Sequence, residues 1–449
     1  MEIGAANGKK GDDRLTLRMG RIDDSDGACS YVKIRKVGTG NLDLGETRQS
    51  KGTEINDGTV TVVHPSALLA NVEANTEISF GGGTLRYGAS VYADTLGEDI
   101  TTDYSAYIKN STAPVSIDTN GKDITWKTAL STNNTAGITK KGEGTLKLDN
   151  WGDDNLNQFT SAERTIRIEG GTLAVVNGRF NQVPNLNAKV LGTGTLRIDP
   201  SEHDGGFRLN SVDALNEFAG TLEWANDLDA SQKAIGFLTR NVDYALANLK
   251  FRVTGTPETA VEVLRSEMTN GRTLILGAMD HLSANAKIKF NETSKIKVTG
   301  DRGDSYLNGT FANKAITLIK GAKAKLTLGA GFNMLAGSTL KVEGGTFENH
   351  ANLANYTVNL AAGTALAGDL TSVPAAKLTD YTVVLQAKAD LDKEQVYDLV
   401  KVPAGAAAPT VDLTALNAGE TKGKWKIRKN AQGIYQLFWV KNGFALIFR

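Results

Sequence analysis

The sequence repeats one short phrase, most clearly as Gly142-Glu143-Gly144-Thr145-Leu146-Lys147-Leu148. Fuller and shorter copies of this phrase are Gly38-Thr39-Gly40-Asn41-Leu42-Asp43-Leu44, Gly58-Thr59-Val60, Gly83-Thr84-Leu85, Gly171-Thr172-Leu173, Gly192-Thr193-Gly194-Thr195-Leu196-Arg197-Ile198 and Gly220-Thr221-Leu222. The threonines at positions 145, 172, 195 and 221 lie 27, 23 and 26 residues apart. That period matches one coil of a parallel β-helix, which needs about three short strands and their turns.

After each glycine, apolar and charged residues alternate. Leu146 and Leu148 flank Lys147, and the same pattern recurs at Leu196 to Ile198, Leu222 to Trp224, Ile288 to Phe290, Ile296 to Val298 and Leu340 to Val342. Side chains of a strand point alternately to its two faces, so the apolar pair is expected inside and the charge outside. Each coil then buries its apolar pair only against the neighbouring coils.

The composition supports this interpretation and limits the possible partners. The chain of 449 residues has 48 glycines and 8 prolines, which suits many tight turns between hydrogen-bonded strands. Lys and Arg total 50, as do Asp and Glu, and this balance argues against nucleic acid as the main partner. Cys29 is the single cysteine, so no intrachain disulfide forms.

The sequence contains neither a membrane span nor an export signal. No apolar run approaches the roughly 20 residues that a spanning helix needs. The start, Met1-Glu2-Ile3-Gly4, lacks the charged and apolar regions of a signal peptide. Either the chain is cytosolic or it is a segment of a larger exported protein, and we favour the second because repeats of this kind are typically extracellular.

Two stretches resemble a known family repeat. Residues 115–130 and 137–150 contain a strand, an Asp-Thr-Asn-Gly turn, a second strand and then Lys-x-Gly-x-Gly-Thr-Leu-x-Leu. Together they resemble the autotransporter-associated β-strand repeat, and a looser copy runs from residue 34 to residue 62. The resemblance covers about residues 34–225. It implies a right-handed parallel β-helix on the bacterial surface that serves adhesion, biofilm formation or envelope architecture. A full autotransporter also has a C-terminal translocator barrel, which this sequence does not contain, so the export route stays open.

The predicted fold is all-β, a right-handed parallel β-helix with a C-terminal antiparallel β cap. We divide the chain into an N-terminal segment or first coils, regular β-helix repeats, a less regular β-helix with insertions and a C-terminal capping region, at residues 1–33, 34–225, 226–380 and 381–449. Residues 230–268 depart from the pattern, and within them Glu258 to Arg265 is expected to be a helix or a decoration on the solenoid.

The C-terminal region has the pattern of an antiparallel meander. We expect strands at residues 424–428, 434–440 and 444–448, joined by turns rich in Asn and Gly. A solenoid end exposes edge hydrogen-bonding groups and apolar rows, and this aromatic-rich meander is predicted to cover them.

No catalytic, cofactor-binding or metal-binding residue is predicted. The aspartate pairs Asp12-Asp13, Asp23-Asp24 and Asp153-Asp154 are adjacent in sequence, so their side chains face opposite ways, as in solvated turns. Carboxylates aligned across successive coils, as a glycosidase needs, remain an alternative. The histidines lack a partner at metal-ligand spacing, and they are His64, His203, His281 and His350.

Two further features are candidate binding sites. Arg302-Gly303-Asp304 is the tripeptide of integrin ligands, but an ordinary exposed turn is the preferred interpretation. An aromatic sugar platform would need exposed tryptophans, and Trp126, Trp151 and Trp224 are the candidates. Because Trp224 alternates with Leu222, it is predicted to lie in the core, which leaves Trp151 as the exposed candidate.

The sequence thus predicts a non-catalytic extracellular structural or adhesive surface protein, a rigid rod that presents binding loops. Its expected partners are a surface protein or glycan of a host or neighbouring cell, or further copies of itself. Two alternatives stay open, a carbohydrate-active β-helix enzyme such as a lyase, a glycosidase or a tailspike-like protein, and a self-assembling filament module.

Overall fold

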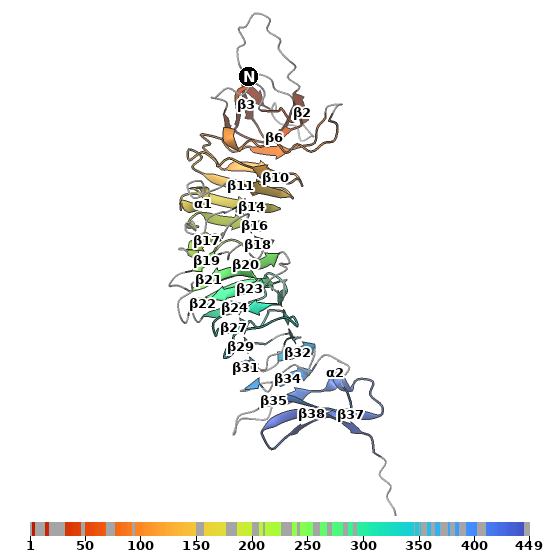
Figure 1. The fold of residues 1–449 in the computed structure, drawn as a ribbon. Coiled ribbons are helices and arrows are strands. Elements are labelled where there is room, and N and C mark those ends of the chain that lie inside the picture. The colour runs from red at the N-terminus through yellow and green to blue at the C-terminus, as the bar shows by residue number, and fades with distance from the viewer. Residues whose placement is uncertain are drawn as a thin grey trace, which may run out of the picture. The chain divides into compact units, whose positions relative to one another are not determined.

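Short parallel strands dominate the computed structural model of the chain (Figure 1). The residues that it describes are 2–4, 14–17, 32–45, 50–68, 77–91, 95–149, 157–176, 186–199, 206–209, 212–225, 236–239, 243–254, 261–266, 272–281, 286–290, 294–344, 346–349, 351, 357–360, 364–368, 376–377, 382–385, 392–401 and 410–443. The chain forms two compact units, Met1–Ala225 and Asn226–Arg449.

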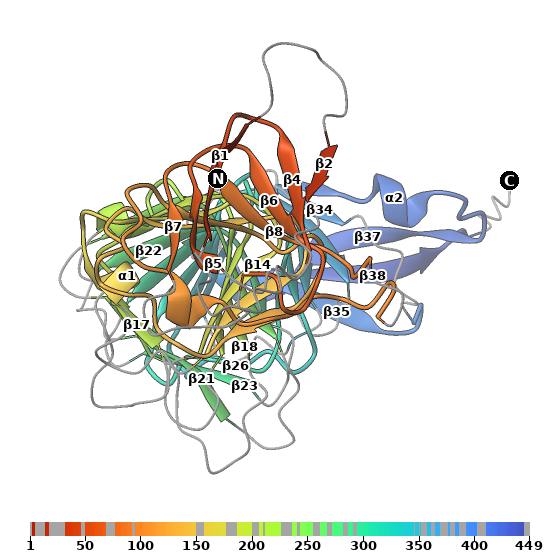
Figure 2. The ribbon, with the colours of Figure 1, turned by 90° about the horizontal axis from the view of Figure 1, so that it is seen from above.

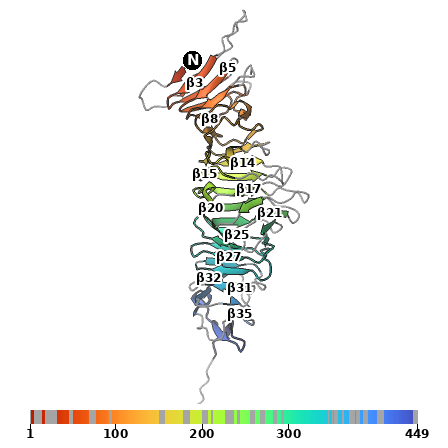
Figure 3. The same cartoon turned by 90° about the vertical axis from the view of Figure 1, so that its left-hand side faces the viewer.

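Three parallel sheets make up the walls of the first unit. The first sheet contains β1 (Glu2–Gly4), β3 (Val32–Val37), β5 (Ser50–Ile55) and β7 (Ile78–Phe80), and Figure 3 shows β3 beside β5. The second contains β2 (Arg14–Leu17), β4 (Asn41–Leu44), β6 (Thr59–Val62), β8 (Thr84–Tyr87), β9 (Val115–Asp118), β11 (Gly137–Lys141), β13 (Thr165–Ile168) and β15 (Lys189–Gly192). In this unit the third contains β10 (Ile124–Trp126), β12 (Thr145–Leu148), β14 (Thr172–Val176), β16 (Thr195–Asp199) and β18 (Thr221–Ala225).

Strand register confirms the repeat found in the sequence. Thr145, Thr172, Thr195 and Thr221 are successive backbone partners in the third sheet. The leucine that follows each threonine is likewise paired, and Leu146, Leu173, Leu196 and Leu222 are all buried. The spacings of 27, 23 and 26 residues are therefore coil lengths, and the apolar alternation marks the inward rows.

The repeated phrase does not always occupy the same wall. Its early copies place β4, β6 and β8 in the second sheet, where Figure 2 shows them following one another, whereas its later copies place β12, β14 and β16 in the third. The change occurs at β8, whose Leu85 is the register partner of Ile117 in β9. Between these strands the chain adds a 3-10 helix at Ser105–Tyr107 and a bridge from Ile108 to Ile78. After this longer connection, the next copy of the phrase forms β12 in the third sheet instead of a strand of the second sheet.

The second unit begins with long strands that later divide. Its larger sheet contains β20 (Tyr244–Thr254) and β22 (Thr273–His281), and the second half of β22 pairs with a different strand from the first half. From there, two rows run side by side, one with β24 (Lys295–Val298), β27 (Thr317–Lys320), β29 (Thr339–Val342) and β31 (Thr357–Leu360), the other with β25 (Ser305–Leu307), β28 (Leu326–Leu328), β30 (Thr346–Asn349) and β32 (Thr364–Gly368). β34 (Thr382–Leu385) and β36 (Thr410–Asp412) extend the second row.

Of the two alternatives predicted for Glu258 to Arg265, the helix is wrong for the residues that the structure describes, 261–265. Residues 261–266 form strand β21, which pairs in parallel with β19 (Gly236–Thr239) and β23 (Ala286–Phe290). Val261 and Val263 are β-branched and suit a strand. A strand also gains backbone hydrogen bonds on both sides, whereas a helix of eight residues is barely stable by itself. Residues 255–260 lie outside the described part of the chain.

The predicted C-terminal antiparallel sheet is present. β37 (Gly423–Lys429) and β38 (Ile434–Lys441) form a hairpin, and β38 pairs antiparallel with β35 (Val396–Lys401) on its other side. β33 (Ala376–Lys377) pairs in parallel with β35. At the hairpin turn, Gly433 adopts a φ of 80°, which glycine tolerates best. The third predicted strand, residues 444–448, lies outside the described residues.

The inward rows can be tested with a matched pair of substitutions. Leu146→Asp places an unpaired carboxylate in a side-chain position that is fully buried, so we expect a loss of about 4 kcal/mol or more in the free energy of unfolding. Lys147→Asp, one residue further on the outer face, is expected to change it by less than about 0.5 kcal/mol. Calorimetry measures both, and equal losses would contradict the assignment of faces.

Candidate functional site

Three lysines occupy inward positions at the corners of the coils. They are Lys36 in β3, Lys140 in β11 and Lys320 in β27, and each is the last inward-facing residue of its strand. The exposed fraction is 3% for Lys36 and 0% for both Lys140 and Lys320. In register, Lys140 stands between Ile117 and Ile168. We call these three residues the corner lysines. Each one replaces an aliphatic side chain in an otherwise apolar row.

Backbone carbonyls bind each buried ammonium. The Nζ atom of Lys140 donates to the carbonyls of Lys141 at 2.8 Å, Gly142 at 2.7 Å and, in the following coil, Gly170 at 3.2 Å. Lys36 makes the same three kinds of bond, two to its own corner and one to Asp57 O at 3.2 Å. Lys320 donates to Gly321 O and to Gly344 O of the following coil. The corner lysines therefore tie successive turns together.

Glycines leave the space that this arrangement needs. Gly171 has a φ of 58°, and a Cβ atom there would lie 2.3 Å from Gly144 O and 2.8 Å from the Nζ of Lys140. At Gly58 an added Cβ would lie 2.5 Å from the Nζ of Lys36. The glycine of one coil thus lies directly over the lysine of the coil before it.

Burial controls the protonation of these lysines. It lowers the pKa of Lys140 to about 8, against the opposing charges of Asp118, Glu143 and Asp123. Burial likewise lowers the pKa of Lys320 to about 8. A lowered lysine pKa is a feature of nucleophilic lysines. Here the side chains are closed off from solvent and bound to carbonyls, so their arrangement serves the fold.

A second polar ladder lies inside the first unit. Ser111, Asn134 and Gln158 belong to successive coils, and all three are buried. The amide of Ser111 donates to Asn134 Oδ1 at 3.1 Å, and Gln158 Nε2 donates to Asn134 O at 3.3 Å. Asn134 Nδ2 donates in turn to Ile108 O at 2.9 Å. Where the coil turns, the side chains of Asn134 and Gln158 thus form hydrogen bonds with buried backbone groups, which need such partners away from water.

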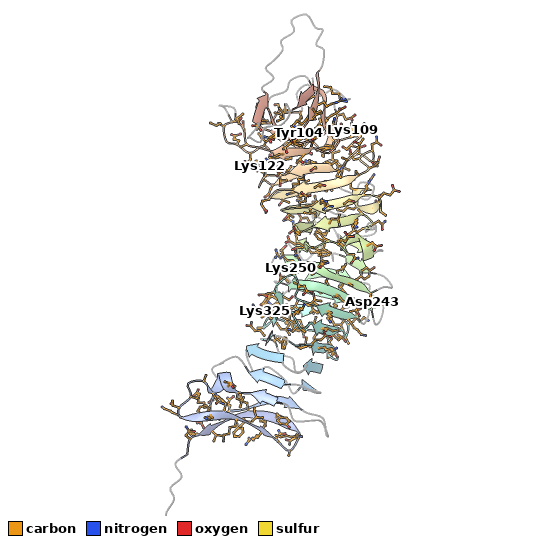
Figure 4. All side chains as sticks on the ribbon, turned by 180° about the vertical axis from the view of Figure 1, so that it is seen from behind. Tyr104, Lys109, Lys122, Asp243, Lys250 and Lys325 are labelled. Atoms are coloured by element: carbon orange, nitrogen blue, oxygen red, sulfur yellow. The ribbon has the colours of Figure 1, made fainter. Side chains whose placement is uncertain are left out.

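Cations neutralise the carboxylates on the outer faces. Asp118 accepts a bond from Arg86 at 2.7 Å. In the second unit, Lys250, labelled in Figure 4, lies 2.6 Å from Asp280. Hydrogen bonds from Lys33 and Arg35 lower the pKa of Glu54.

Glu343 is likewise a carboxylate that is held by cations, Lys297 and Lys341. Burial opposes the shift, but hydrogen bonds from Lys297 and Lys341 lower the pKa of Glu343 overall. A general acid needs the opposite shift.

Most of the polar candidates from the sequence analysis fall outside the part of the chain that the structure describes. The three aspartate pairs, His203, His350 and Trp151 lie outside the described residues, and so does the side chain of His281. His64 accepts a bond from the amide of Ser66 through Nδ1 at 3.0 Å. Within the described part of the chain, no three His, Cys, Asp or Glu residues form a group that could hold a metal ion.

The remaining candidates have structural contacts. Trp126 is buried, and its Nε1 donates to Tyr87 Oη at 3.0 Å, while the predicted core position of Trp224 is confirmed. Asp304 of the Arg-Gly-Asp turn forms an ion pair at 2.8 Å with Lys325, which is labelled in Figure 4. Arg302 is half-buried, and its Nε atom is buried without a hydrogen-bond partner.

The corner lysines are the residues that the sequence reasoning missed. Lys140 lies two residues after Ile138, so strand parity alone places it on the inward face. The repeat motif also contains this lysine, followed by two glycines. A pattern of alternating apolar residues does not by itself reveal a charged residue in an inward row.

Stacked parallel strands with inward apolar rows define the chain as a parallel β-solenoid. Comparison with known proteins gives no match, whether to a protein-family model, to a curated protein or to a solved structure. No helix among the described residues is long and apolar enough to cross a membrane.

The bonds of the corner lysines can be measured by substitution. Lys140→Met keeps most of the side-chain volume but removes the donor to three carbonyls, so we expect the free energy of unfolding to fall by about 2 to 4 kcal/mol. Lys147→Met, on the outer face of the next strand, is the matched control and should change it by less than about 0.5 kcal/mol. Calorimetric melting of both variants tests this. A loss in the control as large as in Lys140→Met contradicts a specific role of the corner.

The lowered pKa values predict a pH dependence. A lysine with a pKa of about 8 in the folded chain and 10.5 when unfolded makes the folded chain bind fewer protons between these values. Stability therefore rises with pH across this window, as the cost of the buried charge disappears. The Tm of the wild type, relative to that of Lys140→Met, should rise between about pH 7.5 and pH 9.5. A constant or shrinking difference contradicts the lowered pKa.

Proposed function

We propose that this chain is a non-catalytic, extracellular structural or adhesive surface protein. The main support for this proposal is that the chain's buried lysines and outer carboxylates form bonds within the fold. The corner lysines bind carbonyls inside the coils, and the outer carboxylates bind neighbouring cations. The polar side chains described in the coils thus maintain the solenoid, which leaves recognition to its surface turns and exposed faces.

The mechanism is geometric. Parallel pairing continues from coil to coil, and each coil adds one strand spacing of about 4.8 Å to each wall. Because the described coils within each unit are hydrogen-bonded to their neighbours, turns that project from the walls keep their spacing along that unit. Such a scaffold suits binding to a protein or glycan on a host or neighbouring cell, or to further copies of the chain. The motif resemblance supports a bacterial surface setting.

A carbohydrate-active enzyme is the principal competing function. A glycosidase places two carboxyl groups about 5 to 10 Å apart across the sugar and raises the pKa of the acid. Among the described residues, Glu54 and Glu343 are the carboxyls with a resolved pKa shift, and both shifts are downward. Their environment favours ionised carboxylates that are held in ion pairs.

The proposal predicts binding without turnover. The purified chain should release no reducing or unsaturated ends from a panel of neutral and acidic polysaccharides, while beads coated with it should adhere to cells. Asp118→Asn and Glu54→Gln test the outer carboxylates. Cleavage that one of these substitutions abolishes, with the fold intact by circular dichroism, would overturn the proposal.

A further inference from the structure

The C-terminal end of the sequence carries an unusual charge. From Thr421 to Arg449 there are seven Lys and Arg and no Asp or Glu, whereas the rest of the chain has 43 Lys and Arg against 50 Asp and Glu. Five of these cations lie in the eight residues from Lys422 to Lys429. A neutral chain therefore concentrates positive charge on one short segment.

Strand alternation arranges part of this charge in one row. In β37, Gly423 and Trp425 are buried, whereas Lys424, Lys426 and Arg428 are exposed on the opposite face. Successive residues on one face of a strand are about 6.8 Å apart. The three cations thus form a straight row along β37, which ends the order of strands in this sheet.

An apolar row lies next to the cations. Antiparallel pairing sets Val440 opposite Lys424 and Phe438 opposite Lys426, and directly opposite residues share a face. Val396 of β35 pairs with Phe438 and is 45% exposed. We call this surface the basic face and define it by Lys424, Lys426, Arg428, Phe438, Val440 and Val396.

Arg428 is held in place on the basic face. Its Nε donates to Gln436 Oε1 at 3.2 Å, and its guanidinium carbon lies 4.9 Å from the centre of the Phe438 ring. An ordered arginine loses less freedom when it binds an anion, and it presents its remaining donors in a fixed fork.

The acidic residues close in sequence leave the row free. Glu420 pairs with Lys393 at 3.0 Å and Glu394 with Lys441 at 3.2 Å, so both are bound to cations outside the basic face. Asp398 of β35 occupies the register position opposite Gln436, so this position belongs to the same face as Arg428, with β38 between the two. Among the described residues, no ion pair involves Lys424, Lys426 or Arg428.

We propose that the basic face binds a linear acidic polysaccharide, with its sulfate or carboxylate groups along the row of cations. This deepens the proposed adhesive function, on which it rests for its biological setting, by naming the class of ligand. A flexible polyanion can align successive charges with cations about 6.8 Å apart, and clusters of Lys and Arg of this density are typical of heparin-binding patches.

Two other polyanionic partners fit the basic face less well. Single-stranded nucleic acid binds through bases stacked on free aromatic faces, but the Phe438 ring carries Arg428. Membrane insertion needs protruding large apolar side chains, and here Phe438 and Val440 are half-buried. Both partners are therefore included in the test as competitors.

Lysines on an edge strand also protect against edge-to-edge pairing, and this role needs no ligand. A reversal of charge separates the two explanations. Lys424→Glu with Lys426→Glu keeps the edge charged and protected, but it repels a polyanion. Lys295→Glu with Lys323→Glu is the matched control, because both of these lysines are exposed and the change in net charge is the same.

The experiment measures binding of fluorescent heparin oligosaccharide to the full chain at about 0.15 M salt. Neutral dextran, a single-stranded oligonucleotide and vesicles that contain phosphatidylserine are compared with it. We expect heparin to bind at least tenfold more tightly than the other three probes, and binding to weaken as salt rises. Lys424→Glu with Lys426→Glu should weaken it at least tenfold and the control less than twofold, while Lys424→Arg with Lys426→Arg retains it.

Heparin should also protect Lys424 and Lys426 of the wild-type chain from acylation, a readout that needs no folded variant. Absence of heparin binding, absence of this protection, an equal loss in the control, or tighter binding to the oligonucleotide or the vesicles would overturn the inference. If the chain does not bind heparin but still adheres to cells, the inference is overturned and the proposed adhesive function is not. Polysaccharide cleavage overturns the proposed function and leaves heparin binding as a separate result.

Discussion

The corner of each coil is the constraint on which the rest of this protein depends. A coil turns the chain between two walls, and its turn carbonyls must find donors although they lie next to an apolar interior. Lys36, Lys140 and Lys320 meet this need with one ammonium that spans two successive turns. At Lys36 and Lys140 a glycine of the following coil is then required for space, so the glycine-rich phrase and the buried cation form one unit there.

Coil register follows from these corners. At the corner of Lys140, where one turn is held to the next, β12 and β14 stack without a shift, and Thr145 and Thr172 become partners. Register stacks Leu146, Leu173, Leu196 and Leu222 in one inward row, and such apolar rows supply the hydrophobic stabilisation that one coil lacks. Asn134 and Gln158 extend the same solution to another corner, where their uncharged side-chain amides donate to the carbonyls of Ile108 and Asn134.

A fold that uses its polar groups internally leaves function to its exposed surfaces. The outer carboxylates are held by cations such as Arg86 and Lys250, and the tripeptide turn is restrained by Lys325. The C-terminal sheet differs, because Lys424, Lys426 and Arg428 gather cations without acidic partners among the described residues. The outer carboxylates of the coils are paired with cations, whereas these three cations form no ion pair with a described residue, and this difference is the basis for proposing an acidic polysaccharide as the ligand.

The sequence by itself determined the coil period, the inward rows and the hairpin of β37 and β38, because period-two alternation and turn glycines are local signals. Tertiary structure decided which wall each copy of the phrase occupies, since this depends on the connection between β8 and β9. It also decided that residues 261–266 form a strand, because the neighbouring strands provide the hydrogen bonds. The bonds of Lys140 and the shared face of Lys426 and Phe438 likewise arise only when separate segments meet in space.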